Sequence, residues 1–384
     1  MQRMTSTERP QWREQAKALG FHYHTLDGQP YWDESAYYQF TLRQIEEDLE
    51  APTEALHAMV LALMDEIIDD EHALDQLHIP EAFRDWIATS WHQQAPYLYG
   101  RMDLAYDGRP PAKLLELNYD TPTALYESGF FQWVWLQDKL DARELPPDTD
   151  QFNALQDYLE QAMALLSKHA TFYFASIRDH AEDWGTTAYL QDIAQQAGHV
   201  VRYLAIEDIG LLTGQFYDPQ GQAIERLFKL YPWEFLLAEP FAVALPGSHT
   251  QWIEPPWKLL ASNKGFLALL WQRYPQHPNL LPCFFEPSRP PPLAPGWVRK
   301  PLFSREGANI ELTRHDGRRY HTPGPYQDSP TIRQALHLLP RFGQHYAVCG
   351  SWVVADRAAG LCIREDLSPI TQDSSRFIPH VIRF

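Results

Sequence analysis

Apolar and polar residues follow different spacings in successive parts of the chain, and each spacing predicts a type of secondary structure. Between residues 41 and 74 apolar side chains recur at every third or fourth position, which is the period of a helix. Pro80 marks the start of a further helix. The chain is therefore expected to begin with a surface arm over residues 1–35, which could carry a short helix from Trp12 to Leu19, and to continue with a helical region.

Residues 97–119 change to an alternation of period two, which is typical of strands. Asp107-Gly108 is a turn signal inside this stretch, so the pattern predicts two strands joined as a hairpin. Thr121-Pro122 ends the second strand, and the very apolar residues 123–140 are expected to be helical.

A strand–helix–strand pattern follows. Its expected elements are a helix over 151–168, a strand over 171–177, a helix over 186–197 and a strand over 199–206. Glu182-Asp183 falls in the loop after the first of these strands, where ligands of such units bind. Residues 257–271 predict one helix that includes Lys264.

Residues 275–296 are rich in proline and predict a linker between subdomains. Beyond them, short alternating segments predict a mostly antiparallel sheet in which 346–354 and 358–365 form a hairpin. The expected fold class is α+β, with antiparallel sheets flanked by helices and an additional α/β substrate subdomain. The expected subdomains are 1–150, with the helical region and the hairpin, then 151–275 and 276–384.

Composition narrows the range of partners. The chain of 384 residues is 45% hydrophobic and 13% aromatic, which is ample for a large core. A net charge of -18 argues against nucleic acid and favours cationic ligands such as amines, although acidity is also common among cytosolic proteins. The three cysteines indicate neither a disulfide framework nor a zinc site. A polar N-terminus and the lack of a membrane-spanning run favour a cytoplasmic location, and the oligomeric state stays open.

The hairpin over 97–119 carries the first candidate chemistry. Arg101 and Asp103 share a strand face, and so do Glu116 and Asn118, so the hairpin can bring all four together. Two carboxylates and an amide oxygen suit Mg²⁺, and an arginine beside them could neutralise a transferring phosphoryl group. A solvent-facing strand with scattered charges is an equally open interpretation of this pattern.

A nucleotide site also needs cations for the phosphates. Lys264, Lys300, Arg305 and Arg364 are the candidates, although each lysine alone could be a surface residue. The loop 303–309 contains small and polar residues, and its backbone amides could close over a phosphate. This loop is expected to be mobile without ligand. The Walker, zincin and nucleophile-elbow motifs are absent from the sequence.

These residues occur in a set of motifs that resembles the glutathionylspermidine synthetase family, specifically its stand-alone bacterial acid–amine ligases, over nearly the whole chain. The motifs are Arg101-Met102-Asp103, Leu115-Glu116-Leu117-Asn118-x-Asp120-Thr121-Pro122-Thr123, Leu230-Tyr231-Pro232-Trp233-Glu234, Ser262-Asn263-Lys264, Lys300-Pro301-x-x-Ser304-Arg305-Glu306-Gly307-Ala308-Asn309 and Gly360-x-x-Ile363-Arg364-Glu365-Asp366. The resemblance implies an ATP-grasp fold with ATP between two antiparallel sheets of the C-terminal half.

The resemblance also implies roles for individual residues. The Mg²⁺ ligands would be Asp103, Glu116 and Asn118. The ATP contacts would be Arg101 at the γ-phosphate, the neighbouring Met102 and Gly307, Lys264, Lys300 and Arg364 at the phosphates, and Gln334 and Leu336 on the adenine side. The acid substrate would meet Asp120, Thr121 and Arg305. The amine would meet Glu182 and Asp183, which could instead cap the following helix.

The implied activity is ATP-dependent amide formation between an acid and an amine through an acyl phosphate. The acid could be a peptide or glutathione-like molecule and the amine polyamine-like, while the amidase domain of bifunctional members is not expected here. Two alternatives stay open: an ATP-binding regulatory module or ATPase that has lost ligation, and a hydrolase that uses Asp103 and Glu116 without ATP.

Overall fold

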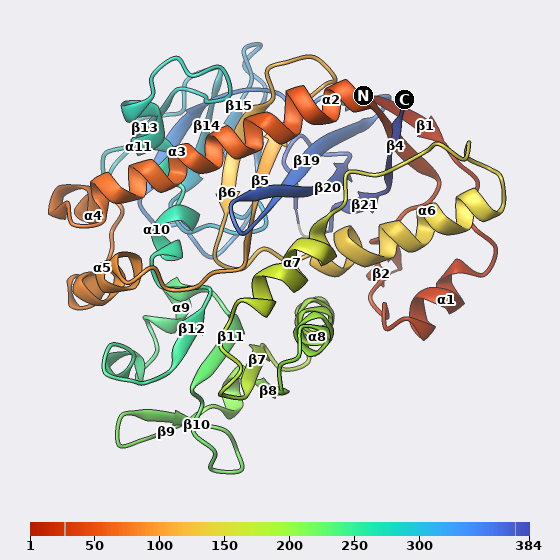
Figure 1. Ribbon diagram of the computed structural model, residues 1–384. Coiled ribbons are helices and arrows are strands. Elements are labelled where there is room, and N and C mark those ends of the chain that lie inside the picture. The colour runs from red at the N-terminus through yellow and green to blue at the C-terminus, as the bar shows by residue number, and fades with distance from the viewer. Residues whose placement is uncertain (27, 373) are drawn as a thin grey trace.

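A computed structural model describes residues 1–26, 28–372 and 374–384. Its helical region is confirmed: α2 (Leu42–Ile45), η1 (Glu46–Glu50) and α3 (Ala51–Ile67) follow one another without a break. The helices α4 (Glu71–Gln76), η2 (Glu81–Phe83) and α5 (Arg84–His92) come next. The long helix α3 packs its apolar face, which includes Leu56 and Val60, against two strands of a large sheet and against α11 (Gly265–Arg273) (Figure 1).

The expectation of a surface arm over residues 1–35 is wrong. The short helix expected from Trp12 is confirmed as α1 (Trp12–Ala18), but the segment also carries β1 (Gln2–Thr5), β2 (Thr25–Leu26) and β3 (Gln29–Pro30). The strand β4 (Ala36–Thr41) pairs with both β1 and β22 (His380–Arg383), so the two ends of the chain lie side by side (Figure 1).

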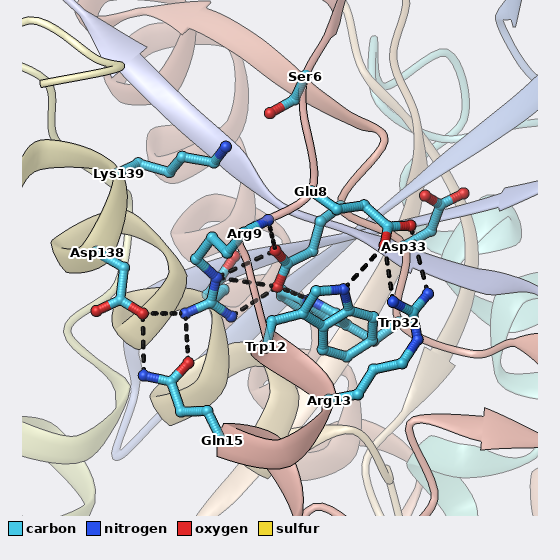
Figure 2. A network of polar contacts seen from close by, with 12 residues as sticks. Ser6, Glu8, Arg9, Trp12, Arg13, Gln15, Trp32, Asp33, Asp138 and Lys139 are labelled. Carbon is cyan, nitrogen blue, oxygen red and sulfur yellow. Dashed lines mark hydrogen bonds and ion pairs between the residues drawn. The ribbon is translucent and has the colours of Figure 1, made fainter. Parts of the chain in front are cut away.

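Aromatic and charged contacts hold this arm in place. Trp12, Phe21 and Trp32 are buried with aromatic neighbours from several segments. The side chain of Arg9 forms a buried ion pair with Glu34 (2.6 Å) and reaches Asp138 of α6 (Gln132–Asp141) at 2.5 Å (Figure 2). An arm with this much buried aromatic surface cannot lie loose in water.

Two antiparallel sheets form the centre of the described structure. The six-stranded sheet has the order β21-β20-β19-β5-β6 with β18 beside β19. Its strands are β5 (Tyr99–Ala105), β6 (Lys113–Asn118), β18 (Arg341–Phe342), β19 (His345–Val354), β20 (Arg357–Asp366) and β21 (Arg376–Ile378). The predicted hairpins β5–β6 and β19–β20 are both confirmed, and β5 pairs with β19.

The second antiparallel sheet has five strands in the order β13-β17-β14-β15-β16. They are β13 (Cys283–Phe285), β14 (Trp297–Pro301), β15 (Glu311–Thr313), β16 (Arg319–His321) and β17 (Thr331–Ala335). The stretch 275–296 is therefore more than a linker, because its strand β13 pairs with β17.

A parallel sheet of order β12-β11-β7-β8 forms the α/β part, in the lower half of Figure 1. Its strands are β7 (Phe172–Ser176), β8 (Val201–Ala205), β11 (Arg226–Leu230) and β12 (Gln251–Ile253). The accompanying elements are η3 (Glu127–Phe131), α7 (Leu155–Ala164), α8 (Ala181–Gln196), η4 (Ile206–Asp208), β9 (Gly210–Leu212), β10 (Gln215–Tyr217), α9 (Trp233–Leu236) and η5 (Ala242–Ala244). The predicted β-α-β pattern is confirmed, but α8 begins at Ala181 instead of Thr186.

The single helix expected over 257–271 is also wrong. The chain forms α10 (Lys258–Ser262) and α11, and Asn263 between them is extended. The Asn263 side chain accepts from the backbone N–H of Gly265 (2.8 Å) and donates to the Leu77 carbonyl (2.7 Å). These side-chain hydrogen bonds replace helical ones and fix the break.

Candidate functional site

The β5–β6 hairpin brings the four predicted polar residues together. Asp103 lies directly opposite Glu116, and Arg101 lies opposite Asn118. The guanidinium of Arg101 donates to the Asp103 carboxylate (Nε to Oδ1, 2.7 Å) and to the carbonyl of Thr123 (3.0 Å). The group is part of a wall between the two antiparallel sheets, so it is not a solvent-facing strand with scattered charges.

The two facing carboxylates have opposite pKa shifts. Burial raises the pKa of Asp103; Arg101 opposes this rise and the charge of Glu116 adds to it. Burial acts in the same direction on Glu116, but Lys264 and Lys300 outweigh it and hold the pKa of Glu116 below its usual range. Two carboxylates placed this close repel one another unless cations lie beside them.

The break between α10 and α11 places Lys264 at this site. Its backbone N–H donates to the Leu302 carbonyl (2.8 Å), and its Nζ lies 3.2 Å from Glu116 Oε2. The same ammonium donates to the carbonyl of Ser304 (2.5 Å). An uninterrupted helix would not give the residue this backbone bond, so the break is what directs Lys264 toward β6.

Lys300 enters from the second sheet. Its Nζ donates to the side-chain oxygen of Gln334 and to the Leu115 carbonyl, both at 2.8 Å. Burial lowers the pKa of Lys300 to about 8, although Glu116 acts against this shift. The Lys300 ammonium donates to neutral oxygens, so its positive charge can still attract an anionic ligand.

A cavity between the two antiparallel sheets, here called the inter-sheet cavity, joins these groups. Its lining includes the charged residues Asp103, Glu116, Lys264 and Lys300 and the backbone of Gly307. Most of its other lining residues are apolar and come from both sheets and the segments beside them: Leu115, Val298, Ile310, Leu312, Ala335, Leu336, Leu339, Val348 and Ile370. Gln334 and Leu336 both line it, whereas the side chain of Met102 is buried in the core.

A neighbouring polar cavity shares Asp103, Glu116, Lys264, Gly307 and Thr371 with the inter-sheet cavity. Its other polar lining residues are Arg101, Asn118, Thr121, Thr123, Glu182, Arg305, Glu306 and Arg364. Most of the predicted acid-side and phosphate-side residues therefore surround one space next to the carboxylate pair.

Arg305 is held on the rim of this polar cavity by groups from different elements. Its Nε donates to Glu234 of α9 (2.7 Å), and one terminal nitrogen donates to the Thr121 hydroxyl (2.8 Å). Asp120 lies beneath it and is fully buried, with its carboxylate bound to Lys229 Nζ (2.6 Å). Asp120 therefore supports Arg305 from below and does not itself line either cavity.

Glu182 and Asp183 lie in the first turn of α8 rather than in a loop. Glu182 lines the polar cavity. Asp183 instead lies 3.1 Å from His180 Nδ1, and this contact raises the pKa of His180 to about 9. The N-cap of α8 is His180, whose ring accepts from the backbone N–H of Asp183 (3.3 Å), so neither acid caps the helix with its side chain, and Glu182 faces the site.

Glu127 is a buried acid near Glu182 that the sequence interpretation missed. It lies in η3 and is 1% exposed; its Oε1 accepts from the Tyr31 hydroxyl (2.8 Å), and its Oε2 has no hydrogen-bond partner among the described residues. Burial and the neighbouring charge of Glu182 raise the pKa of Glu127 to about 8. An acid inside the apolar run 123–140 was the available sequence signal.

Comparison with known proteins shows which family the chain belongs to. The family model for the glutathionylspermidine synthase preATP-grasp region matches residues 3–383. The chain belongs to the glutathionylspermidine synthase family. A Haemophilus influenzae protein named "Putative acid--amine ligase" is 40% identical over 99% of both chains.

More distant relatives are larger. Trypanothione synthetase of Crithidia fasciculata is 27% identical over 84% of this chain, and the bifunctional glutathionylspermidine synthetase/amidase of Escherichia coli is 24% identical over 97% of it. The matched regions are 53% and 63% of those two proteins. Membership of this family makes the protein a carbon–nitrogen ligase.

A solved structure shows a similar fold. The glutathione synthetase-like effector of Globodera pallida superposes with a TM-score of 0.58 at 9% identity and covers 98% of both chains. This likeness confirms a mixed α+β fold of the glutathione synthetase type. No helix in the described part of the chain is long and apolar enough to cross a membrane.

The donor set of the carboxylate pair suits a hard cation. The Asn118 amide lies next to Glu116 (Nδ2 to Oε1, 3.4 Å), across from Arg101. The described residues contain no group of three or more His, Cys, Asp and Glu side chains that could hold a metal by themselves. Two carboxylates and one amide oxygen fit Mg²⁺, because this ion keeps water and substrate oxygens in its shell.

Proposed function

We propose that the protein is an ATP-dependent acid–amine ligase with an ATP-grasp fold. The observation that carries this proposal is the inter-sheet cavity, whose mostly apolar lining also includes Lys264 and Lys300 together with a carboxylate pair. A flat base fits the apolar lining residues, and a polyphosphate with its metal fits the charged ones. The membership of a ligase family supports the same interpretation.

The predicted nucleotide residues other than Met102, whose side chain lies in the core, have a place in this proposal. Gln334 and Leu336 lie on the adenine side, and Lys264, Lys300 and Arg364 meet the phosphates. Asp103, Glu116 and Asn118 would hold Mg²⁺, which supplies positive charge to the phosphate oxygens when bound. The loop containing Gly307 would cover the phosphates with its backbone.

The polar cavity is the proposed reaction space. The carboxylate of the acid would lie between Arg101 and Arg305, where it takes the γ-phosphoryl group of ATP and ADP leaves. The amine nitrogen then attacks the acyl carbon, phosphate leaves, and the nitrogen loses a proton as the amide forms. The arginines act by positioning and by neutralising charge, as in other phosphoryl transfers.

Glu127 and Glu182 form the proposed amine side. Glu182 lines the polar cavity, and its charge is, after burial, the main cause of the raised pKa of Glu127, whose Oε2 has no hydrogen-bond partner among the described residues. An ammonium group can donate N–H hydrogen bonds to both carboxyls, and Glu127, once ionised, could accept its proton.

The test is phosphate release from ATP when the wild-type protein is given acids and amines in pairs. The proposal expects release that needs both an acid and an amine, together with an amide product found by mass spectrometry. Glu127→Gln should raise the amine KM while the ATP KM stays unchanged. Nucleotide binding without any acid- or amine-stimulated release would contradict the ligase proposal.

A further inference from the structure

Lys229 is a charged residue in an otherwise apolar place. It lies on β11, an inner strand of the parallel sheet whose five residues are all buried, and it pairs in register with Ala175 of β7. Its side chain is fully buried, and its ammonium lies 4.1 Å from the centre of the Trp233 ring. Replacing both members of a buried ion pair by apolar residues is often neutral for stability, so a buried pair here calls for another explanation.

The ammonium of Lys229 joins the parallel sheet to the reaction space. It donates to Asp120 Oδ1 (2.6 Å) and to the Tyr231 carbonyl (2.9 Å). The other oxygen of Asp120 accepts from the backbone N–H of Trp233 (2.8 Å), the first residue of α9. The backbone N–H of Asp120 donates to the Ser262 hydroxyl (2.7 Å) of α10. Asp120 thus connects the end of β6 to α9 and α10.

Every side chain that holds Arg305 depends on this connection. Glu234 follows Trp233 in α9, and Thr121 follows Asp120 in the chain. Asp120 itself lies 3.9 Å from a terminal nitrogen of Arg305. The two carboxylates of Asp120 and Glu234 would repel one another without the charge of Lys229 underneath.

We propose that Lys229 is a positioning residue for the acid substrate. Through its ion pair with Asp120 it fixes α9 and the segment after β6, and these hold the guanidinium of Arg305 in place. This inference rests on the proposed function, since it takes Arg305 to be the group that meets the acid. The competing interpretation is a pair that only stabilises the fold.

Two variants separate these interpretations. Lys229→Met removes the ammonium but leaves Asp120 charged and buried, so it is expected to fold poorly. The double variant Asp120→Asn/Lys229→Met is neutral and of similar volume, and it should fold. The control is Arg9→Met/Glu34→Gln, which removes another buried ion pair, in the N-terminal arm, whose residues line neither cavity.

The deciding measurement compares the double variant with the wild-type protein in two quantities, the KM for the acid and the KM for ATP. A misplaced binding group can cost a factor of about 10 to 100, so the acid KM should rise about tenfold or more while the ATP KM changes less than about twofold. The control should keep both KM values. An unchanged acid KM in the folded double variant overturns the proposal.

A crystal structure of the double variant gives a second result that needs no turnover. Arg305 displaced from Glu234 and Thr121 supports the positioning role, and Arg305 in its wild-type place overturns it. If the wild-type protein releases no phosphate with any acid, the proposed function fails, and this structural result still decides the role of Lys229.

Discussion

The buried carboxyl of Glu127 leads to a prediction that needs no substrate. Burial and the charge of Glu182 raise its pKa from 4.5 to about 8. Between these two values the folded protein keeps a proton that the unfolded chain has lost. The free energy of unfolding must therefore fall as the pH rises through this window, and the loss is complete above pH 8.

The size of the effect follows from the width of the window. One pKa unit corresponds to about 1.4 kcal/mol, so the wild-type protein should lose roughly 5 kcal/mol from this group by pH 8. In Glu127→Gln the amide oxygen can still accept the hydrogen bond from Tyr31, and the side chain has no proton to lose. Near pH 5 the two proteins should have similar stability, and above pH 8 the variant should be more stable.

Urea unfolding of both proteins at several pH values from 5 to 9 measures this difference. Glu14→Gln, at an exposed position of α1, is the control for the substitution itself. A difference in unfolding free energy between wild type and Glu127→Gln that stays constant over the whole range would refute the reasoning about Glu127.

Two further predictions concern the nucleotide. Gly307 has φ +70°, and a Cβ there would lie 2.2 Å from the Thr371 carbonyl oxygen, so Gly307→Ala should lower the rate of phosphate release about tenfold. The matched control is Gly343→Ala, at φ +66° with open space around it. Equal rates of phosphate release in the two variants would count against a role for the Gly307 contact. Because the pKa of Lys300 is about 8, ATP affinity should fall as the pH rises from 7 to 9. Lys300→Met should weaken ATP binding about 10- to 100-fold and flatten that pH dependence. Titration calorimetry can measure both effects.

The parts of the fold that sequence predicted best are governed by local signals. The β5–β6 hairpin follows from alternation and an Asp-Gly turn, and the β7–α8–β8 unit follows from a change of period. Both are decided by neighbours in the chain. For the same reason, the four polar residues of the hairpin could be placed on common faces before the structure was known.

The errors arise where distant segments decide the outcome. The break after α10 depends on the Leu77 carbonyl, which lies far away in the sequence. The N-terminal arm is fixed by pairing with β4 and by packing against α6, and β13 is fixed by pairing with β17. The secondary-structure propensity of a proline-rich or polar stretch cannot reveal which distant segments it pairs with or packs against.

The same limit applies to the candidate site. The lysines could be named from motifs, but only the fold shows that Lys264 and Lys300 face Glu116 from two different elements. The pKa of Glu127 is raised partly by the charge of Glu182, which belongs to another helix, so only the fold shows the relation between the two residues. The subdomain ranges and the mobility of the loop 303–309 without ligand stay predictions.

The central claim is that the carboxylate pair of the β5–β6 hairpin holds the metal of an ATP-dependent ligase. Asp103→Asn keeps the shape of the side chain and removes one charged ligand, so it should reduce acid- and amine-dependent phosphate release at least about 100-fold and raise the Mg²⁺ concentration required. The direct measurement is phosphate release against Mg²⁺ concentration for wild type and this variant, with ATP, acid and amine present. A variant with the wild-type rate and the wild-type Mg²⁺ requirement would contradict the account.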